Sequence, residues 1–211
     1  MSVFAALTAA ANALTTADLP YVWGGGHAEA GVPSTGIAGG PGANGKTIGF
    51  DCSGSVAAVL SGGGVWTFGD SVPADNGVIS ELLSEHLIAR GAASGTDAVN
   101  LYDDPGVHIF MSIGGRFFGT SDGGDGNASQ PNDGAGWLDD GAPDATNKAF
   151  KAYHVLPAVL SADTSYVPAL TLQAGTTKRF VDSLAVGDGI DVTYSVGTNG
   201  ALTAQDVSSA S

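Results

Sequence analysis

Phe50-Asp51-Cys52-Ser53-Gly54-Ser55-Val56 contains the only cysteine of this 211-residue chain, and an apolar run follows it directly. Residues 55–60 read Ser-Val-Ala-Ala-Val-Leu and three glycines follow at 62–64, which predicts a short buried helix that begins near Cys52. The first N–H groups of a helix lack intrahelical partners and favour negative charge, so a thiol placed there should ionise more readily and act as a nucleophile. The alternative is an inert cysteine that packs as a small hydrophobe.

Two further segments flank this stretch in the chain. Upstream lies Leu19-Pro20-Tyr21-Val22-Trp23-Gly24-Gly25-Gly26-His27, and downstream lies Pro105-Gly106-Val107-His108-Ile109-Phe110-Met111-Ser112-Ile113. Taken together, the three motifs resemble those of the NlpC-type peptidoglycan peptidases, a papain-like group of cell-wall enzymes. The match is nearest to an actinobacterial and phage-associated branch of that family, and it covers about residues 18–155.

The resemblance implies an α+β fold in which N-terminal helices pack on an antiparallel sheet. It also implies that Cys52 is the nucleophile and that His108, on a following strand, holds the proton. Tyr21 would shape the substrate pocket beside the nucleophile, and Asp51, Ser53 and His27 are further candidates for contact with substrate. The family acts on the stem peptide of peptidoglycan, most often between D-glutamate and diaminopimelate, and requires no metal or other cofactor.

The segment around His108 predicts a β-hairpin. Val107–Ile113 and Arg116–Thr120 alternate as strands across Gly114-Gly115, a strong two-residue turn signal. If Ile113 pairs with Arg116, Ser121 faces His108 across the hairpin. The family usually has His, Asn or Gln as its third polar residue, whereas this chain offers the hydroxyl of Ser121 or of Thr120. A bulge in the strand would decide between these two hydroxyls, and Ser121 is preferred.

Composition excludes several classes of partner. The net charge of −14 lacks the basic surface that nucleic acid requires and disfavours anionic membranes and teichoic acids. One cysteine excludes an internal disulfide, and no segment has the length and apolarity of a transmembrane span. The acidic, glycine-rich stretch at 122–149 lacks the spacing of a calcium-binding loop, so no metal is expected there.

Periodicity places the remaining elements of the first domain. Apolar positions predict a helix over residues 2–16 and a second over 78–90, which Gly91 would terminate. Residues 28–49 form a long glycine-rich loop that we expect to border the cleft. Residues 150–155 should form the strand that closes the domain.

From about Ser161 the chain changes character, which suggests a peptidase domain at 1–158 and a small β-rich appendage at 159–211. Four short strands are expected there, at 169–172, 177–181, 190–196 and 201–207. The appendage would dock to a larger assembly.

Two observations suggest how such an enzyme reaches the cell wall. The N-terminal residues do not resemble a secretory signal, and a phage tail tip with other tail proteins as partners would deliver the enzyme instead. A bacterial cytoplasmic or non-classically secreted enzyme is the alternative location. A virion protein whose papain-like domain only binds, and an acyltransferase or amidase of the same fold, are the alternative functions.

Overall fold

The computed structural model describes residues 2–69, 71–120, 134–138 and 145–161, together with the backbone of three strands between 177 and 210. The chain divides into two compact units, Met1–Tyr166 and Val167–Ser211. The sequence placed this division at 158/159. Among the described helices none is long and apolar enough to span a membrane.

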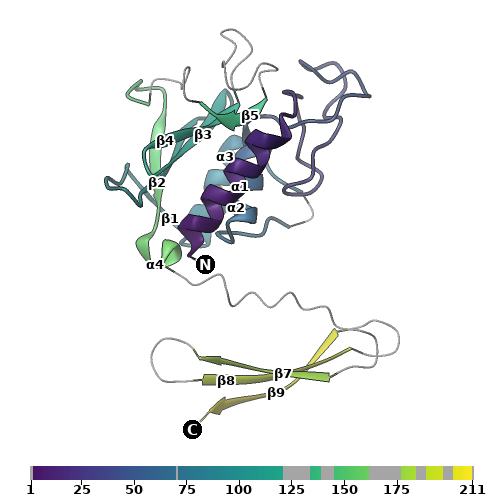
Figure 1. Ribbon diagram of the computed structural model, residues 1–211, viewed down its shortest axis with the longest axis vertical. Helices are drawn as coiled ribbons and strands as arrows, with labels where there is room; N and C mark the ends of the chain where they lie inside the picture. The colour runs from purple at the N-terminus through teal and green to yellow at the C-terminus, as the bar shows by residue number, and fades with distance from the viewer. Residues whose placement is uncertain are drawn as a thin grey trace. The chain divides into compact units, whose positions relative to one another are not determined.

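The first unit is an α+β fold, as expected, with helices packed on an antiparallel sheet (Figure 1). Its helices are α1 (Val3–Ala17), α2 (Cys52–Gly62), α3 (Asp75–Ser84) and the single turn α4 (Pro157–Leu160). Its six strands are β1 (Ile88–Arg90), β2 (Val99–Asp104), β3 (His108–Ile113), β4 (Arg116–Thr120), β5 (Ala135–Trp137) and β6 (Lys151–Val155). They lie in the order β1-β6-β2-β3-β4-β5.

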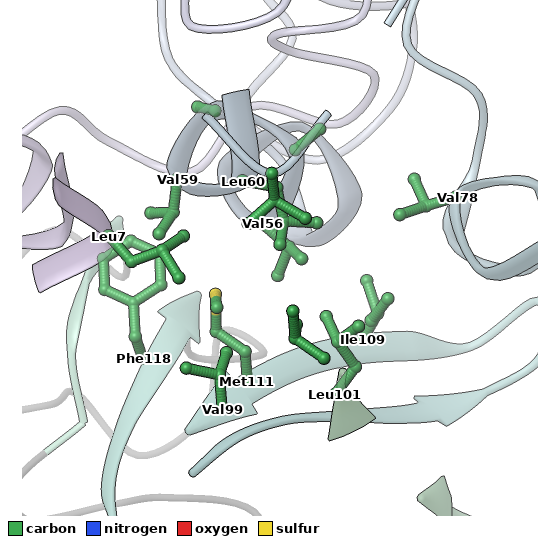
Figure 2. Packing of buried hydrophobic residues seen from close by; sticks show 14 of the residues in the cluster. Leu7, Val56, Val59, Leu60, Val78, Val99, Leu101, Ile109, Met111 and Phe118 are labelled. Carbon is green, nitrogen blue, oxygen red and sulfur yellow. The ribbon is translucent and has the colours of Figure 1, made fainter. Parts of the chain in front are cut away.

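Helix α2 lies at the centre of the core. Every residue from Cys52 to Leu60 is buried, which explains why this segment shows a plain apolar run instead of an amphipathic one. Figure 2 shows Val56, Val59 and Leu60 directed towards Met111 and Ile109 of β3. The packing therefore fixes the start of α2 against the central strands of the sheet.

The other face of the sheet carries a separate set of aromatic side chains. Tyr102 stacks on Phe110 with ring centroids 4.9 Å apart, and Phe150 meets Phe110 edge-on at 5.0 Å. The alternation predicted for β3 is thus confirmed, with Phe110 on one face and Ile109 and Met111 on the helix-covered face.

The β3–β4 hairpin also matches the prediction. Gly114 and Gly115 both have positive φ, and Ile113 pairs with Arg116. This pairing continues to Met111 and Phe118. The other edge of β4 pairs with β5 from Phe118 to Thr120.

The helix predicted over 78–90 is wrong in its second half. α3 begins at Asp75 and ends at Ser84, because His86 takes a left-handed backbone conformation with φ of 55°. Ile88–Arg90 then pairs with Tyr153–Val155 as strand β1. Strands β2 and β5 were not predicted. Residues 151–155 form the last strand of the first unit in chain order, as expected, and this strand lies between β1 and β2 in the sheet.

The second unit contains a three-stranded antiparallel sheet in the order β7-β8-β9. Its strands are β7 (Thr177–Ser183), β8 (Gly189–Val196) and β9 (Leu202–Ala210). They correspond to three of the four expected strands, and the expected strand at 169–172 lies outside the described residues.

A glycine inside α2 tests how tightly the helix start is packed. A Cβ at Gly54 would lie 2.2 Å from the carbonyl oxygen of Gly25. Alanine normally stabilises a helix interior by about 1 kcal/mol relative to glycine. Here we expect Gly54→Ala to destabilise the first unit by about 1–3 kcal/mol, because backbone must move to relieve the overlap.

Urea unfolding followed by tryptophan fluorescence measures this effect, since all three tryptophans lie in the first unit. Gly69→Ala is the matched control, because nothing lies within 4 Å of a Cβ at that position. A Gly54→Ala protein as stable as the parent would show that the start of α2 is not closely packed.

Candidate functional site

Cys52 is the first residue of α2 and lies in the wall of a cavity of about 250 Å³. The wall also includes Trp23, Ile37, Asp75 and Val107. Two larger cavities, of about 630 and 690 Å³, lie elsewhere on the first unit and do not include Cys52. Of these three cavities, the one at Cys52 places a thiol beside two carboxyl groups and an imidazole.

The thiol of Cys52 is not activated by the helix start in this structure. Burial raises its pKa to about 11, and the charges of Asp51 and Asp75 act in the same direction. Hydrogen bonds from the backbone N–H groups of Ile109 and Ser53 oppose the shift but do not overcome it. The expectation of an easily ionised thiol is therefore wrong, and at neutral pH the side chain is a thiol.

His108 is the first residue of β3 and is buried. Its ring lies 6.0 Å from that of Phe110 in a stacked arrangement and 6.5 Å from that of Phe150 edge-on. The next residue, Ile109, provides the backbone N–H that bonds to Cys52, so the start of β3 contacts the thiol directly. The Cys52–His108 dyad itself stays a prediction.

The structure describes one of the two residues expected to orient His108, Thr120, and does not describe the other, Ser121. Thr120 is fully buried, and the register of β4 places it on the same face as Phe118, towards the helices. His108 shares the opposite face with Phe110. Ser121 lies outside the described residues. The identity of the orienting group stays a prediction.

Three of the four predicted substrate-contact residues line the cavity: His27, Asp51 and Ser53. Tyr21 does not line this cavity; it is half-buried and forms a parallel bridge with Phe50. The segment that carries Tyr21 thus helps to hold the residues that lead into α2.

Asp51 caps α2 and is also the centre of a hydrogen-bond network. Its carboxylate accepts hydrogen bonds from the N–H of Gly54 at 2.8 Å, the N–H of Gly24 at 3.0 Å and the hydroxyl of Ser53 at 3.1 Å. His27 Nε2 lies 2.9 Å from both carboxylate oxygens. This carboxylate therefore joins the glycine-rich segment to the start of the helix.

His27 is held more firmly than its place in a glycine-rich loop suggested. Its Nδ1 lies 2.8 Å from the carbonyl oxygen of Val72, in the segment that precedes α3. Burial on its own would lower the pKa of His27, but the hydrogen bond and charge of Asp51 and the Val72 carbonyl outweigh it, so the pKa is raised.

Two carboxyl groups near the cavity were missed from the sequence. Asp75 begins α3, lines the cavity and accepts a hydrogen bond from the N–H of Gly106 at 2.8 Å. Asp103 on β2 is only 1% exposed, and burial followed by the charge of Asp75 raises its pKa to about 6. Within the described ranges, no group of three or more His, Cys, Asp and Glu residues is arranged to hold a metal ion.

The rim of the cavity is apolar and open to solvent. Trp23 is 45% exposed, Ile37 is 62% exposed and Val107 is 67% exposed, although all three are large hydrophobic residues. The loop 28–49 reaches the rim through Ile37, whose N–H donates to the carbonyl of Trp23 at 2.9 Å. The sequence-based expectation that this loop borders the cleft is confirmed.

Comparison with known proteins gives one structural similarity. The P60 domain from M. avium paratuberculosis antigen MAP1272c superimposes with a TM-score of 0.45 at 18% sequence identity, covering 72% of this chain and 94% of that one. No family model matches the chain. No curated protein matches it in sequence.

The state of the thiol can be measured directly. Because the pKa of Cys52 is raised to about 11, the rate of alkylation by iodoacetamide should be low at pH 7 and rise about tenfold per pH unit up to about pH 10. The experiment uses the native protein, with a small-molecule thiol as reference. A rate that levels off below pH 8 would contradict the raised pKa.

Proposed function

We propose that this protein is a cysteine endopeptidase that cleaves the stem peptide of peptidoglycan. The observation that carries the proposal is the position of Cys52, which begins a buried helix, lines a cavity and contacts the backbone of β3 beside His108. The motif resemblance supplies the substrate class, and the bond between D-glutamate and diaminopimelate is the proposed cleavage point.

In this mechanism the resting thiol is neutral, since its pKa lies near 11. Attack of Sγ on the peptide carbonyl carbon forms a C–S bond while His108 takes the thiol proton. For this step the His108 ring has to turn from the Phe110 face of the sheet towards Sγ. The tetrahedral oxyanion collapses by breaking the C–N bond, and His108 returns the proton to the leaving amine. Water then hydrolyses the thioester to release the acid and regenerate the thiol.

Backbone N–H groups at the start of α2 are the proposed donors to the oxyanion. The N–H of Ser53 already points to the sulfur, so it lies close to any carbonyl that the sulfur attacks. Donors of this kind contribute about 3–4 kcal/mol each to transition-state stabilisation in well-studied enzymes. They require no charged side chain, which suits an acidic cavity.

The rim suggests how the peptide lies. Trp23, Ile37 and Val107 offer exposed apolar surface around the thiol. Alanine methyl groups and the aliphatic chain of diaminopimelate are apolar parts of a stem peptide that would cover this surface. The substrate would thus cross the rim with its scissile amide above Cys52.

The raised pKa of the thiol favours one second candidate, a wall-binding protein with a weak or inactive site. A thiol that is neutral at pH 7 and flanked by two carboxyl groups is a slow nucleophile unless a base removes its proton. Such a protein would bind peptidoglycan through the same cavity without releasing peptides.

Substitution of the nucleophile separates these functions. Cys52→Ala should lower the release of peptides from purified cell walls by at least about 10³-fold, because no covalent intermediate can form. The unfolding midpoint should change little, since a small side chain remains at a buried position. Ser61→Ala, near the far end of the same helix, is the control and should keep activity.

Equal rates for Cys52→Ala and the parent would refute the peptidase. A folded parent protein that releases nothing from any wall, yet sediments with it, would establish the binding function instead.

We further propose that the protein is delivered on a phage tail tip, with the unit Val167–Ser211 as the contact to other tail proteins. A net charge of −14 gives no electrostatic attraction to an anionic wall, and a particle that carries several copies raises their local concentration there. A bacterial enzyme outside any particle is the competing location.

Mass spectrometry of gradient-purified virions tests this location. The chain should be present at a copy number similar to that of other tail proteins, and washing with high salt should not remove it. Detection only in the lysed-host fraction would exclude the tail-tip location.

A further inference from the structure

We propose that His27 is a positioning residue, whose doubly protonated ring ties together three of the segments that form the wall around Cys52. This inference takes the cavity from the proposed function, but it concerns the construction of the site and not the bond that is cleaved. It differs from the sequence-based role of His27 as a contact to substrate.

The geometry of the ring requires two protons. Nδ1 lies 2.8 Å from the carbonyl oxygen of Val72, which can only accept a hydrogen bond. Nε2 lies 2.9 Å from both carboxylate oxygens of Asp51, which also accept. A neutral imidazole has one N–H and can satisfy only one of these contacts, so both are made only by the imidazolium.

Ser53 does not provide an alternative for the neutral ring. Its hydroxyl lies 3.2 Å from His27 Nε2 and 3.1 Å from Asp51 Oδ1. If Nε2 lost its proton, the hydroxyl would have to turn from the carboxylate to the ring. The nitrogen lone pair would still face two carboxylate oxygens at 2.9 Å, which is repulsive.

The charge also compensates a buried carboxylate. Asp51 is buried, and a carboxylate in such a place needs hydrogen bonds and an opposite charge. Gly24, Gly54 and Ser53 supply neutral hydrogen bonds, while His27 supplies the positive charge. Among the described residues of the cavity wall there is neither Lys nor Arg.

The contacts of His27 connect three of the segments around the site. The ring binds Asp51 at the start of α2, and Val72 lies three residues before Asp75, where α3 begins. The backbone N–H of Val72 in turn donates a hydrogen bond to the carbonyl oxygen of His27 at 2.9 Å. The segment 24–27 is thus fixed to both helix starts, and the cavity lies between them.

The sign of the pH effect follows from these contacts. The ionisable groups of the wall that face this region are Asp51, Asp75 and the thiol of Cys52, and Asp51 is the one bonded to the ring. The pKa of His27 is raised above its ordinary value, so its contribution to stability is complete below about pH 6.5. That contribution is lost as the pH rises through the raised pKa.

The test measures unfolding in the Cys52→Ala background, so that neither catalysis nor the thiol affects the result. His27→Gln can donate one neutral hydrogen bond to Asp51 and does not titrate. We expect its thermal midpoint at pH 6 to be at least about 3 °C lower and to vary less between pH 6 and pH 9 than that of the parent. Both proteins contain Asp103 and the other three histidines, so the contributions of these groups cancel when the two pH profiles are compared.

His154→Gln is the matched control. The Nδ1 of His154 also bonds to a backbone carbonyl, that of Gly91, at 2.8 Å, but it has no carboxylate partner in the described residues. Its pH profile should therefore run parallel to that of the parent. His27→Lys, which restores a positive charge, should recover part of the stability lost in His27→Gln.

NMR titration of the four histidines gives a second readout that requires no variant to fold stably. The His27 ring should still carry both protons at pH 7. A neutral His27 ring at that pH, or parallel stability profiles for the parent and His27→Gln, would overturn the proposal. A stabilising, charged His27 in a protein that cleaves no wall would support this inference and refute the peptidase.

Discussion

The site depends on one buried carboxylate, that of Asp51. It caps α2, accepts a hydrogen bond from the N–H of Gly24 and pairs with His27, so the segment 24–27 and the start of α2 meet at its two oxygens. The backbone of Gly25 then lies against the first turn of α2, where neither Gly25 nor Gly54 has room for a side chain. The position of Cys52 follows from this arrangement, because it is the next residue after Asp51.

The same arrangement explains why the thiol does not behave as its place on a helix predicts. A helix start lowers the pKa of a thiol through its free N–H groups and its dipole. Here the thiol is buried and two carboxyl groups lie nearby, and these effects are the larger ones. An adjacent base is therefore essential to the proposed chemistry.

The sequence was sufficient for the features that depend on local signals. The start of α2, the Gly114-Gly115 hairpin and the Ile113–Arg116 pair follow from turn chemistry and periodicity. Features that depend on distant partners were missed: Ile88–Arg90 continues an apolar helical pattern and becomes a strand only because β6 lies beside it. Likewise, nothing local to Gly24–His27 indicates that Val72 and Asp51 will hold the imidazole.

The rim around Cys52 is less constrained in sequence than the floor of the cavity. Two backbone hydrogen bonds attach the loop 28–49 to Trp23: the N–H of Ile37 donates to the carbonyl of Trp23, and the N–H of Trp23 donates to the carbonyl of Pro41. Neither bond depends on the Ile37 side chain. Ile37 and Val107 project into solvent, so exchanging them costs the core nothing. The floor of the cavity is fixed by packing and charge, while its rim is open to substitution. Changes in ligand preference can therefore accumulate at the rim, by natural variation or by engineering, in a protein that continues to fold.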